Sequence, residues 1–191
     1  MKKKEAILKA ATHLFSIKGF KETHMSEISA MTDAAEGTIF YHFTSKEKLF
    51  LTILKNFKEN IVFEFNHYKT DKKFKSGLAM VEDIIKFYLH FDGPMGECFL
   101  LLHRHEAYVL AQTNAECREH LETIYNCFVD IFEHAIIIGQ KDGSIGNVSA
   151  KKTAMIIFAM VDALMRFNTF GLYDAGSLYN ELIMACKKIL S

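Results

Sequence analysis

The scarcity of helix-breaking residues is the feature that most constrains the fold of this chain. Its 191 residues include one proline, Pro94, and ten glycines. An all-β fold needs frequent turns, which are rich in both residue types. Apolar residues make up 50% of the chain and recur at helical spacing, as in Ile7, Ala11, Leu14 and Phe15. The pattern predicts an all-α protein with a large buried core.

The expected helices follow one another through short polar connections. Gly19 ends the first helix, and Thr23 and Ser149 are candidate N-caps for later ones. After the first, helices are expected over residues 24–31, 35–41, 45–68, 78–91, 96–112, 114–140, 150–170 and 178–190. Asp92-Gly93-Pro94 and the segment 142–147 are typical of breaks between helices. No strand and no internal repeat are expected.

Charge is distributed unevenly along a chain whose formal net charge is zero. Residues 1–58 contain ten lysines and six acidic residues, a net of +4. Residues 59–191 contain thirteen basic and seventeen acidic residues, a net of −4. A basic N-terminal region followed by an acidic remainder is typical of a protein that contacts nucleic-acid phosphates with that region alone.

The cysteines and the apolar runs indicate the cellular setting. None of Cys98, Cys117, Cys127 and Cys186 belongs to a CxxC pair, so reduced thiols are expected rather than a zinc or redox motif. The N-terminus has no uninterrupted apolar signal-peptide core. The longest apolar run, residues 154–161, is far shorter than the ~20 residues that cross a bilayer. We therefore expect a soluble, cytoplasmic protein with no membrane partner.

Residues 20–49 have the spacing of a helix-turn-helix motif, in which two short helices are joined by a tight turn. The major groove of B-DNA admits one helix, so the reading helix must present small or planar side chains to the base edges. Gly37 and Thr38 meet that need. Ile39 and Phe43 lie four residues apart and are expected to anchor the reading helix against the first helix.

The same segment resembles the TetR/AcrR family of repressors. The family turn, Gly-Val-Ser, is Asp33-Ala34-Ala35 here, and Phe40 stands where the family usually has tyrosine. Asp33 tolerates left-handed geometry and is a candidate cap for the reading helix, whereas Ala35 cannot cap it. These departures bear on operator sequence and affinity. The resemblance is carried by Gly37-Thr38-Ile39-Phe40-Tyr41-His42-Phe43-Thr44-Ser45-Lys46-Glu47-Lys48-Leu49 and, upstream, by Ile7-Leu8-Lys9-Ala10-Ala11, Leu14-Phe15 and Gly19-Phe20.

The resemblance implies contacts with double-stranded DNA. Tyr41, His42 and Lys46 lie at the end of the reading helix or just beyond it, where their donors are expected to reach phosphate oxygens. Glu36 is expected either to accept a hydrogen bond from a cytosine amine or to be an ordinary solvated residue. The expected DNA-binding residues are Ser26, Glu36, Gly37, Thr38, Phe40, Tyr41, His42 and Lys46.

The rest of the chain carries weaker signals. Residues 153–167 are apolar on nearly all sides, so a helix there must be buried on more than one face. By resemblance, the last two helices form a four-helix bundle with a second copy. We expect a three-helix helix-turn-helix head over residues 1–48 and a helical effector-binding and dimerisation body over residues 49–191. The resemblance also implies a homodimer that is released from a palindromic operator by a small, mainly apolar effector.

Aromatic and methionine side chains between residues 80 and 170 are core by default, and the resemblance implies that a subset lines an effector pocket. Asp162 and Arg166 lie four residues apart in the most apolar helix. They either form an ion pair or orient the effector, and the two roles are compatible. The expected effector-binding residues are Phe99, His103, Tyr125, Phe128, Phe158, Asp162, Met165 and Arg166.

Two other classes of function fit the sequence less well. A helical di-iron enzyme needs two Glu-x-x-His motifs, and the chain has one, Glu64 to His67. His103 and His105 point to opposite sides of a helix, so they cannot share a metal ion. Without a phosphate loop, HExxH or GxSxG motif, no catalytic residue, metal site or cofactor is expected. An adaptor that binds only protein leaves the basic N-terminal region unexplained.

Overall fold

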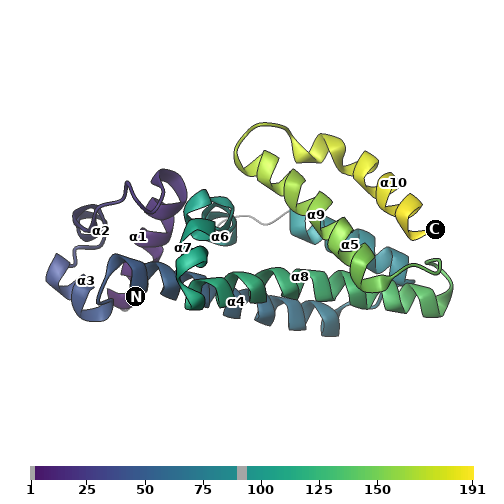
Figure 1. The fold of residues 1–191 in the computed structure, drawn as a ribbon, viewed down its shortest axis with the longest axis horizontal. Coiled ribbons are helices and arrows are strands. Elements are labelled where there is room, and N and C mark those ends of the chain that lie inside the picture. Colours follow the sequence, from purple (N-terminus) through teal and green to yellow (C-terminus); the bar gives the residue numbers. More distant parts are fainter. Residues whose placement is uncertain (1–2, 90–93) are drawn as a thin grey trace. The chain divides into compact units, whose positions relative to one another are not determined.

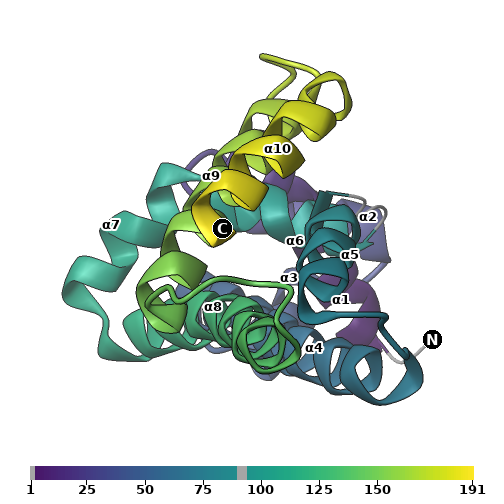
Figure 2. The ribbon, with the colours of Figure 1, turned by 90° about the vertical axis from the view of Figure 1, so that its right-hand side faces the viewer.

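The computed structural model describes residues 3–89 and 94–191, and the regular structure in those residues is entirely helical (Figure 1 and Figure 2). The predicted all-α class is confirmed. The helices are α1 (Lys3–Lys18), α2 (Met25–Thr32), α3 (Glu36–His42), α4 (Lys46–Asp71), α5 (Gly77–Leu89), α6 (Pro94–His103), α7 (His105–Thr113), α8 (Ala115–Asp142), α9 (Ala150–Thr169) and α10 (Tyr179–Leu190), with a 3-10 turn at Ala175–Leu178.

The predicted spans agree with the observed helices to within a turn, with one exception. The helix expected over residues 96–112 is two helices, because Arg104 adopts an extended conformation (φ −74°, ψ 141°) between α6 and α7. Its guanidinium donates to the carbonyl oxygens of Ser16 at 2.9 Å and Ile17 at 2.6 Å. Residues 90–93, which include most of the predicted Asp-Gly-Pro break and the end of the helix expected at 78–91, lie outside the described residues.

The chain divides into two compact units. The N-terminal unit comprises residues 1–61 and 93–123, and the C-terminal unit comprises residues 62–92 and 124–191. α4 begins at Lys46, so the domain boundary predicted at residue 48 falls inside the first turn of this helix. That boundary stays a prediction.

The N-terminal unit is built on the apolar face of α1. Ile7, Leu14 and Phe15 are buried at the predicted helical spacing, and α1 contacts α2, α3 and α6. The rings of Phe15, Phe20 and Phe50 pack against one another, with centroids 5.2 to 5.9 Å apart. This aromatic cluster fixes the turn after α1 against the first part of α4.

In the C-terminal unit, side chains of the predicted loop at residues 142–147 accept hydrogen bonds from the first N–H groups of α5. The carboxylate of Asp142 accepts a hydrogen bond from the Gly77 N–H at 2.7 Å, and the Ser144 hydroxyl accepts one from the Leu78 N–H at 3.2 Å. Hydrogen bonds from Ser144, followed by that from Gly77, hold the pKa of Asp142 below its ordinary value. Ser149 is the N-cap residue of α9, as predicted, but its side chain makes no capping hydrogen bond.

The cysteine side chains of the described chain are reduced thiols, and three of them are shielded from water. None of the cysteines of the described chain forms a disulfide. Burial raises the pKa of the Cys98 thiol to about 12 and those of Cys117 and Cys186 to about 11, so these thiols stay protonated at neutral pH.

Among the described residues, no helix combines the length and apolarity that a bilayer-spanning segment needs.

Candidate nucleic-acid interface

The turn between α2 and α3 depends on one residue with a positive φ. Asp33 ends α2 with φ 51° and ψ 21°, the left-handed conformation that glycine adopts most easily and aspartate tolerates. Ala34 is buried beneath the turn, and Ala35 is the N-cap of α3 without a side-chain hydrogen bond. Asp33 therefore supplies the turn geometry of the helix-turn-helix, and it does so as the C-cap of α2, not as a cap for α3.

The start of α2 differs from the prediction. Its N-cap is His24, whose N–H donates to the carboxylate of Glu27 at 2.9 Å. The predicted cap, Thr23, is wrong, because its buried hydroxyl donates to the Gly19 carbonyl at 2.8 Å and closes the turn after α1 instead. Glu27 also pairs with Lys18. The hydrogen bond from His24, followed by that from Lys18, lowers the pKa of Glu27.

The reading helix α3 presents one face to solvent and buries the other. Ile39 and Phe43 are buried, as predicted for its anchors. Thr38 is half-buried, and Tyr41 is 84% exposed. α3 spans seven residues, and the major groove of B-DNA is wide enough to admit one α-helix. Six of the predicted DNA-binding residues are exposed: Ser26, Glu36, Gly37, Phe40, Tyr41 and His42.

Lys46 has partners inside the protein that the sequence did not indicate. Its ammonium donates to the carbonyl oxygens of Thr23 at 2.8 Å and Lys21 at 3.2 Å. It also lies 4.7 Å from the centroid of the Phe20 ring. Burial lowers the pKa of Lys46, and the nearby Glu22 opposes that shift. Lys46 thus fastens the first turn of α4 to the connection between α1 and α2, which leaves one of its three N–H donors for other contacts.

Side chains distant in sequence also hold the head within the N-terminal unit. Arg104 supplies the hydrogen bonds to the last carbonyls of α1 described above. His13 of α1 pairs with Glu97 of α6 at 2.8 Å, and Lys48 of α4 pairs with Glu116 of α8 at 2.9 Å. Sequence reasoning missed these roles, because no local pattern links residues so far apart along the chain.

The predicted effector residues divide between the two units. Phe99 and His103 are buried in the N-terminal unit, where Phe99 packs edge-on against Phe57 with centroids 5.3 Å apart. The other six belong to the C-terminal unit: Tyr125, Phe128, Phe158, Asp162, Met165 and Arg166.

An aromatic cluster brings several of those six residues together. Phe128 stacks on Phe158 with an interplanar angle of 12°, and Tyr125 lies 5.9 Å from Phe158, centroid to centroid. Tyr88, which was not among the predicted effector residues, contacts both Phe128 and Phe158 and donates its hydroxyl to Asp162 at 2.7 Å. The cluster is therefore an apolar centre with one hydrogen-bonded carboxylate at its edge.

α9 and α10 expose apolar side chains on the side opposite their buried face. Met155 and Ile156 of α9 are 54% and 53% exposed, and Met184 of α10 is 56% exposed. The buried residues of α9 are Thr153, Ala154, Ile157, Phe158, Val161 and Met165. α9 is thus apolar on two sides, as its sequence predicts, and a single chain covers only one of them.

Comparison with known proteins agrees with this arrangement. Residues 7–53 match the model of the bacterial regulatory proteins of the tetR family. The HTH-type transcriptional regulator YdgC of Bacillus subtilis is 24% identical over 184 residues, covering 83% of this chain and 92% of YdgC. The HTH-type transcriptional repressor NicS of Pseudomonas putida is 35% identical over 83 residues, 44% of this chain and 36% of NicS.

The fold is shared with solved regulators as well. The structure of the transcriptional regulator FadR from Bacillus subtilis in complex with stearoyl-CoA superposes with a TM-score of 0.69 at 18% identity, covering 98% of this chain and 99% of FadR. The left-handed turn at Asp33, the anchored reading helix and the matched segment thus point to one assignment. Residues 7–53 form a helix-turn-helix segment of the tetR family of bacterial regulatory proteins, and the described chain has the fold of a solved transcriptional regulator.

Proposed function

We propose that this chain is a repressor that binds a palindromic operator as a homodimer and is released by a small, mainly apolar effector. Residues 1–48 form the DNA-binding domain, and residues 49–191 form the effector-binding and dimerisation domain. The exposed face of α3, held by the buried Ile39 and Phe43, carries the proposal. A twofold dimer places one such helix in each of two successive major grooves. The protein acts in the cytoplasm, where its operator lies.

Operator binding is tested with the full chain and the DNA upstream of its own gene in a gel-shift titration. We expect specific retardation of a palindromic fragment, with an affinity that falls steeply as salt rises. A fragment of equal length with a scrambled palindrome is the control. Equal retardation of both fragments, or binding that salt does not weaken, contradicts the proposal.

Replacing Thr38 by alanine is expected to relax sequence preference at one or two base positions of each half-site. Thr38 lies in the first turn of α3, on the side proposed to face the bases, and a lost base contact costs about 1 kcal/mol or more of discrimination. Binding to a library of operator variants measures the preference at each position. Thr123→Ala, in α8, is the matched control, and identical profiles for wild type and Thr38→Ala count against base contact by Thr38.

Replacing Lys46 by methionine is expected to weaken binding to every sequence about tenfold and to lower the slope of log affinity against log salt by about one. Methionine keeps an unbranched side chain of similar length but removes the ammonium, and with it the bonds to Thr23 and Lys21 and the contact with the Phe20 ring. Salt titrations of wild type and variant measure the slope. A uniform loss of affinity with an unchanged slope limits Lys46 to its internal role and contradicts phosphate contact.

We propose that the effector binds at the aromatic cluster of the C-terminal unit. Phe128 and Phe158 offer apolar surface, whereas Asp162, Met165 and Arg166 lie along the same helix, α9. Pockets for small molecules are mainly apolar, with a few polar groups that set orientation. The stearoyl-CoA bound to FadR, whose fold this chain shares, supports an effector with a long apolar part. Phe99 and His103 of the N-terminal unit stay separate predictions.

Effector binding and operator binding are expected to weaken each other by the same factor, because coupling between two sites is reciprocal. Stearoyl-CoA is the first probe, titrated calorimetrically into the full chain with and without operator DNA. Coupling is typically ~1–3 kcal/mol, which is roughly a 5- to 150-fold change in Kd. Phe158→Ala should lose the ligand while retaining the operator. Equal ligand affinity in both titrations, for this probe and for any hit of a thermal-shift screen, contradicts release of the operator by an effector.

A further inference from the structure

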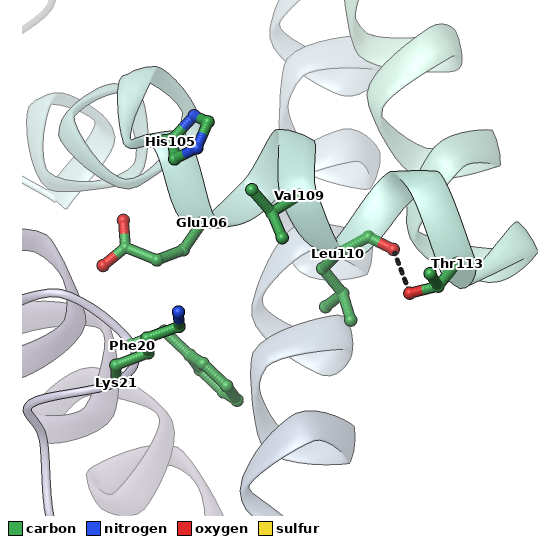
Figure 3. Close-up of a pocket in the computed structure, with 7 residues that line it drawn as sticks. All are labelled: Phe20, Lys21, His105, Glu106, Val109, Leu110 and Thr113. Carbon is green, nitrogen blue, oxygen red and sulfur yellow. Dashed lines mark hydrogen bonds between the residues drawn. The ribbon is translucent and has the colours of Figure 1, made fainter.

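A cavity lies in the N-terminal unit, beside the turn after α1. It has a volume of about 480 Å³, within the range of sites that hold small organic molecules. Figure 3 shows it between α7 and the turn after α1. Its lining residues are Phe20, Lys21, His105, Glu106, Val109, Leu110 and Thr113.

The cavity has an apolar wall. Five lining residues belong to α7 and follow helical spacing from His105 to Thr113, so they form one stripe along the helix. In the middle of the stripe, Val109 is exposed and Leu110 is half-buried. Phe20 faces them from the turn. An apolar group bound here would remove these three side chains from water.

The cavity also has two charged side chains of opposite sign. Figure 3 shows Glu106 reaching from α7 toward the turn that carries Lys21. Among the described residues, neither side chain has a hydrogen bond or an ion pair, whereas Lys18 and Glu27 nearby pair with each other. Glu106 is half-buried, so its carboxylate is partly removed from water without a hydrogen-bond donor.

The closest fixed cation does not satisfy Glu106. A Cβ placed on Gly19 would lie 2.5 Å from Glu106 Oε1 and would displace that carboxylate, whereas Arg104 Nη1, at 3.6 Å, would be in ordinary contact. The Arg104 guanidinium donates through Nε and Nη2 to two carbonyls at the negative end of α1, and within the described residues no ion pair joins its Nη1 to Glu106. Glu106 therefore still lacks donors, and Lys21 still lacks an acceptor.

We propose that this cavity binds a zwitterionic α-amino acid with a large apolar side chain. The ligand ammonium donates to Glu106, its carboxylate accepts from Lys21, and its side chain covers Phe20, Val109 and Leu110. A ligand with only a positive charge would be repelled by Lys21, and one with only a negative charge would be repelled by Glu106. An apolar zwitterion instead pairs with both groups at once. This site is distinct from the proposed effector site in the C-terminal unit.

Occupancy of this site has a consequence that rests on the proposed function. Phe20 and Lys21 form the turn that Lys46 fastens to α4, so a ligand bound there restrains the connection between α1 and the helix-turn-helix. The binding itself is measured without DNA. A protein that binds the amino acid but no operator would contradict the proposed function and leave the site intact.

Calorimetry of the full chain with L-phenylalanine tests the site directly. We expect binding, with 3-phenylpropanoate and 2-phenylethylamine, which lack the ammonium and the carboxylate respectively, at least about tenfold weaker. N-acetyl-phenylalanine amide, which has the same side chain and no charge, should also bind at least about tenfold more weakly. No detectable binding of phenylalanine or leucine at millimolar concentration, or equal binding of the uncharged analogue, overturns the proposal.

Three variants locate the ligand. Glu106→Gln should weaken phenylalanine about tenfold without weakening 3-phenylpropanoate, and Lys21→Met should do so without weakening 2-phenylethylamine. Val109→Trp should fill the cavity and abolish binding. Glu122→Gln and Lys73→Met remove the same charges from exposed positions elsewhere and should bind as wild type. If Val109→Trp does not fold, the two charge variants decide, and unchanged phenylalanine affinity in both refutes the site.

Discussion

Replacing Ile156 by glutamate is expected to convert the dimer into monomers and to lower operator affinity by about a hundredfold or more. Ile156 lies with Met155 and Met184 on the apolar face of α9 and α10 that a single chain leaves uncovered. A carboxylate at the centre of an apolar interface loses its hydration without gaining a partner. The monomer then binds each half-site alone and loses the gain from two linked heads.

Light scattering coupled to size exclusion measures the oligomeric state, and a gel shift measures the affinity. Ile137→Glu is the matched control, because Ile137 is an isoleucine of α8 that is 37% exposed and lies outside the proposed interface. It should remain a dimer with wild-type affinity. A wild-type chain that is monomeric at micromolar concentration, or an Ile156→Glu variant that stays dimeric, contradicts dimerisation through α9 and α10.

Replacing Gly77 by alanine is expected to destabilise the C-terminal unit by about 3 kcal/mol, near the upper end for overpacking. A Cβ on Gly77 would lie 2.1 Å from the Gly139 nitrogen and 2.5 Å from the Ala135 carbonyl oxygen. These are backbone atoms of α8, which cannot rotate away as a side chain can. The shift would also disturb the hydrogen bond from the Gly77 N–H to Asp142. Thermal unfolding should show Tm lower by roughly 10 °C.

The same substitution at Gly37, Gly37→Ala, is expected not to lower stability. A Cβ on Gly37 has nothing within 4 Å, and the residue lies inside α3. Alanine is the better helix former, so stability should be unchanged or raised by up to about 1 kcal/mol. A Tm of Gly77→Ala as little changed as that of Gly37→Ala would mean that helix packing around Gly77 is looser than the structure indicates. The operator affinity of Gly37→Ala is a separate readout, since Gly37 is one of the residues proposed to contact DNA.

The helices and the DNA-binding head follow from local information in the sequence. The spacing of Ile7, Leu14 and Phe15 predicts α1, and Ile39 and Phe43 predict how α3 is anchored. The left-handed conformation of Asp33 was open to the same reasoning, since few residues tolerate that geometry. These features depend on neighbours within a few positions along the chain, where steric limits and helical periodicity act directly.

What only the tertiary structure decided is which distant groups meet. Arg104 interrupts a continuous helical pattern because carbonyls at the end of α1 accept its guanidinium. Lys46, expected on phosphate alone, donates to two carbonyls more than twenty residues away, and Tyr88 finds Asp162 across the C-terminal unit. Such contacts offset the entropy of closing long loops only once the whole unit has packed. Their partners therefore cannot be read from spacing along a single chain.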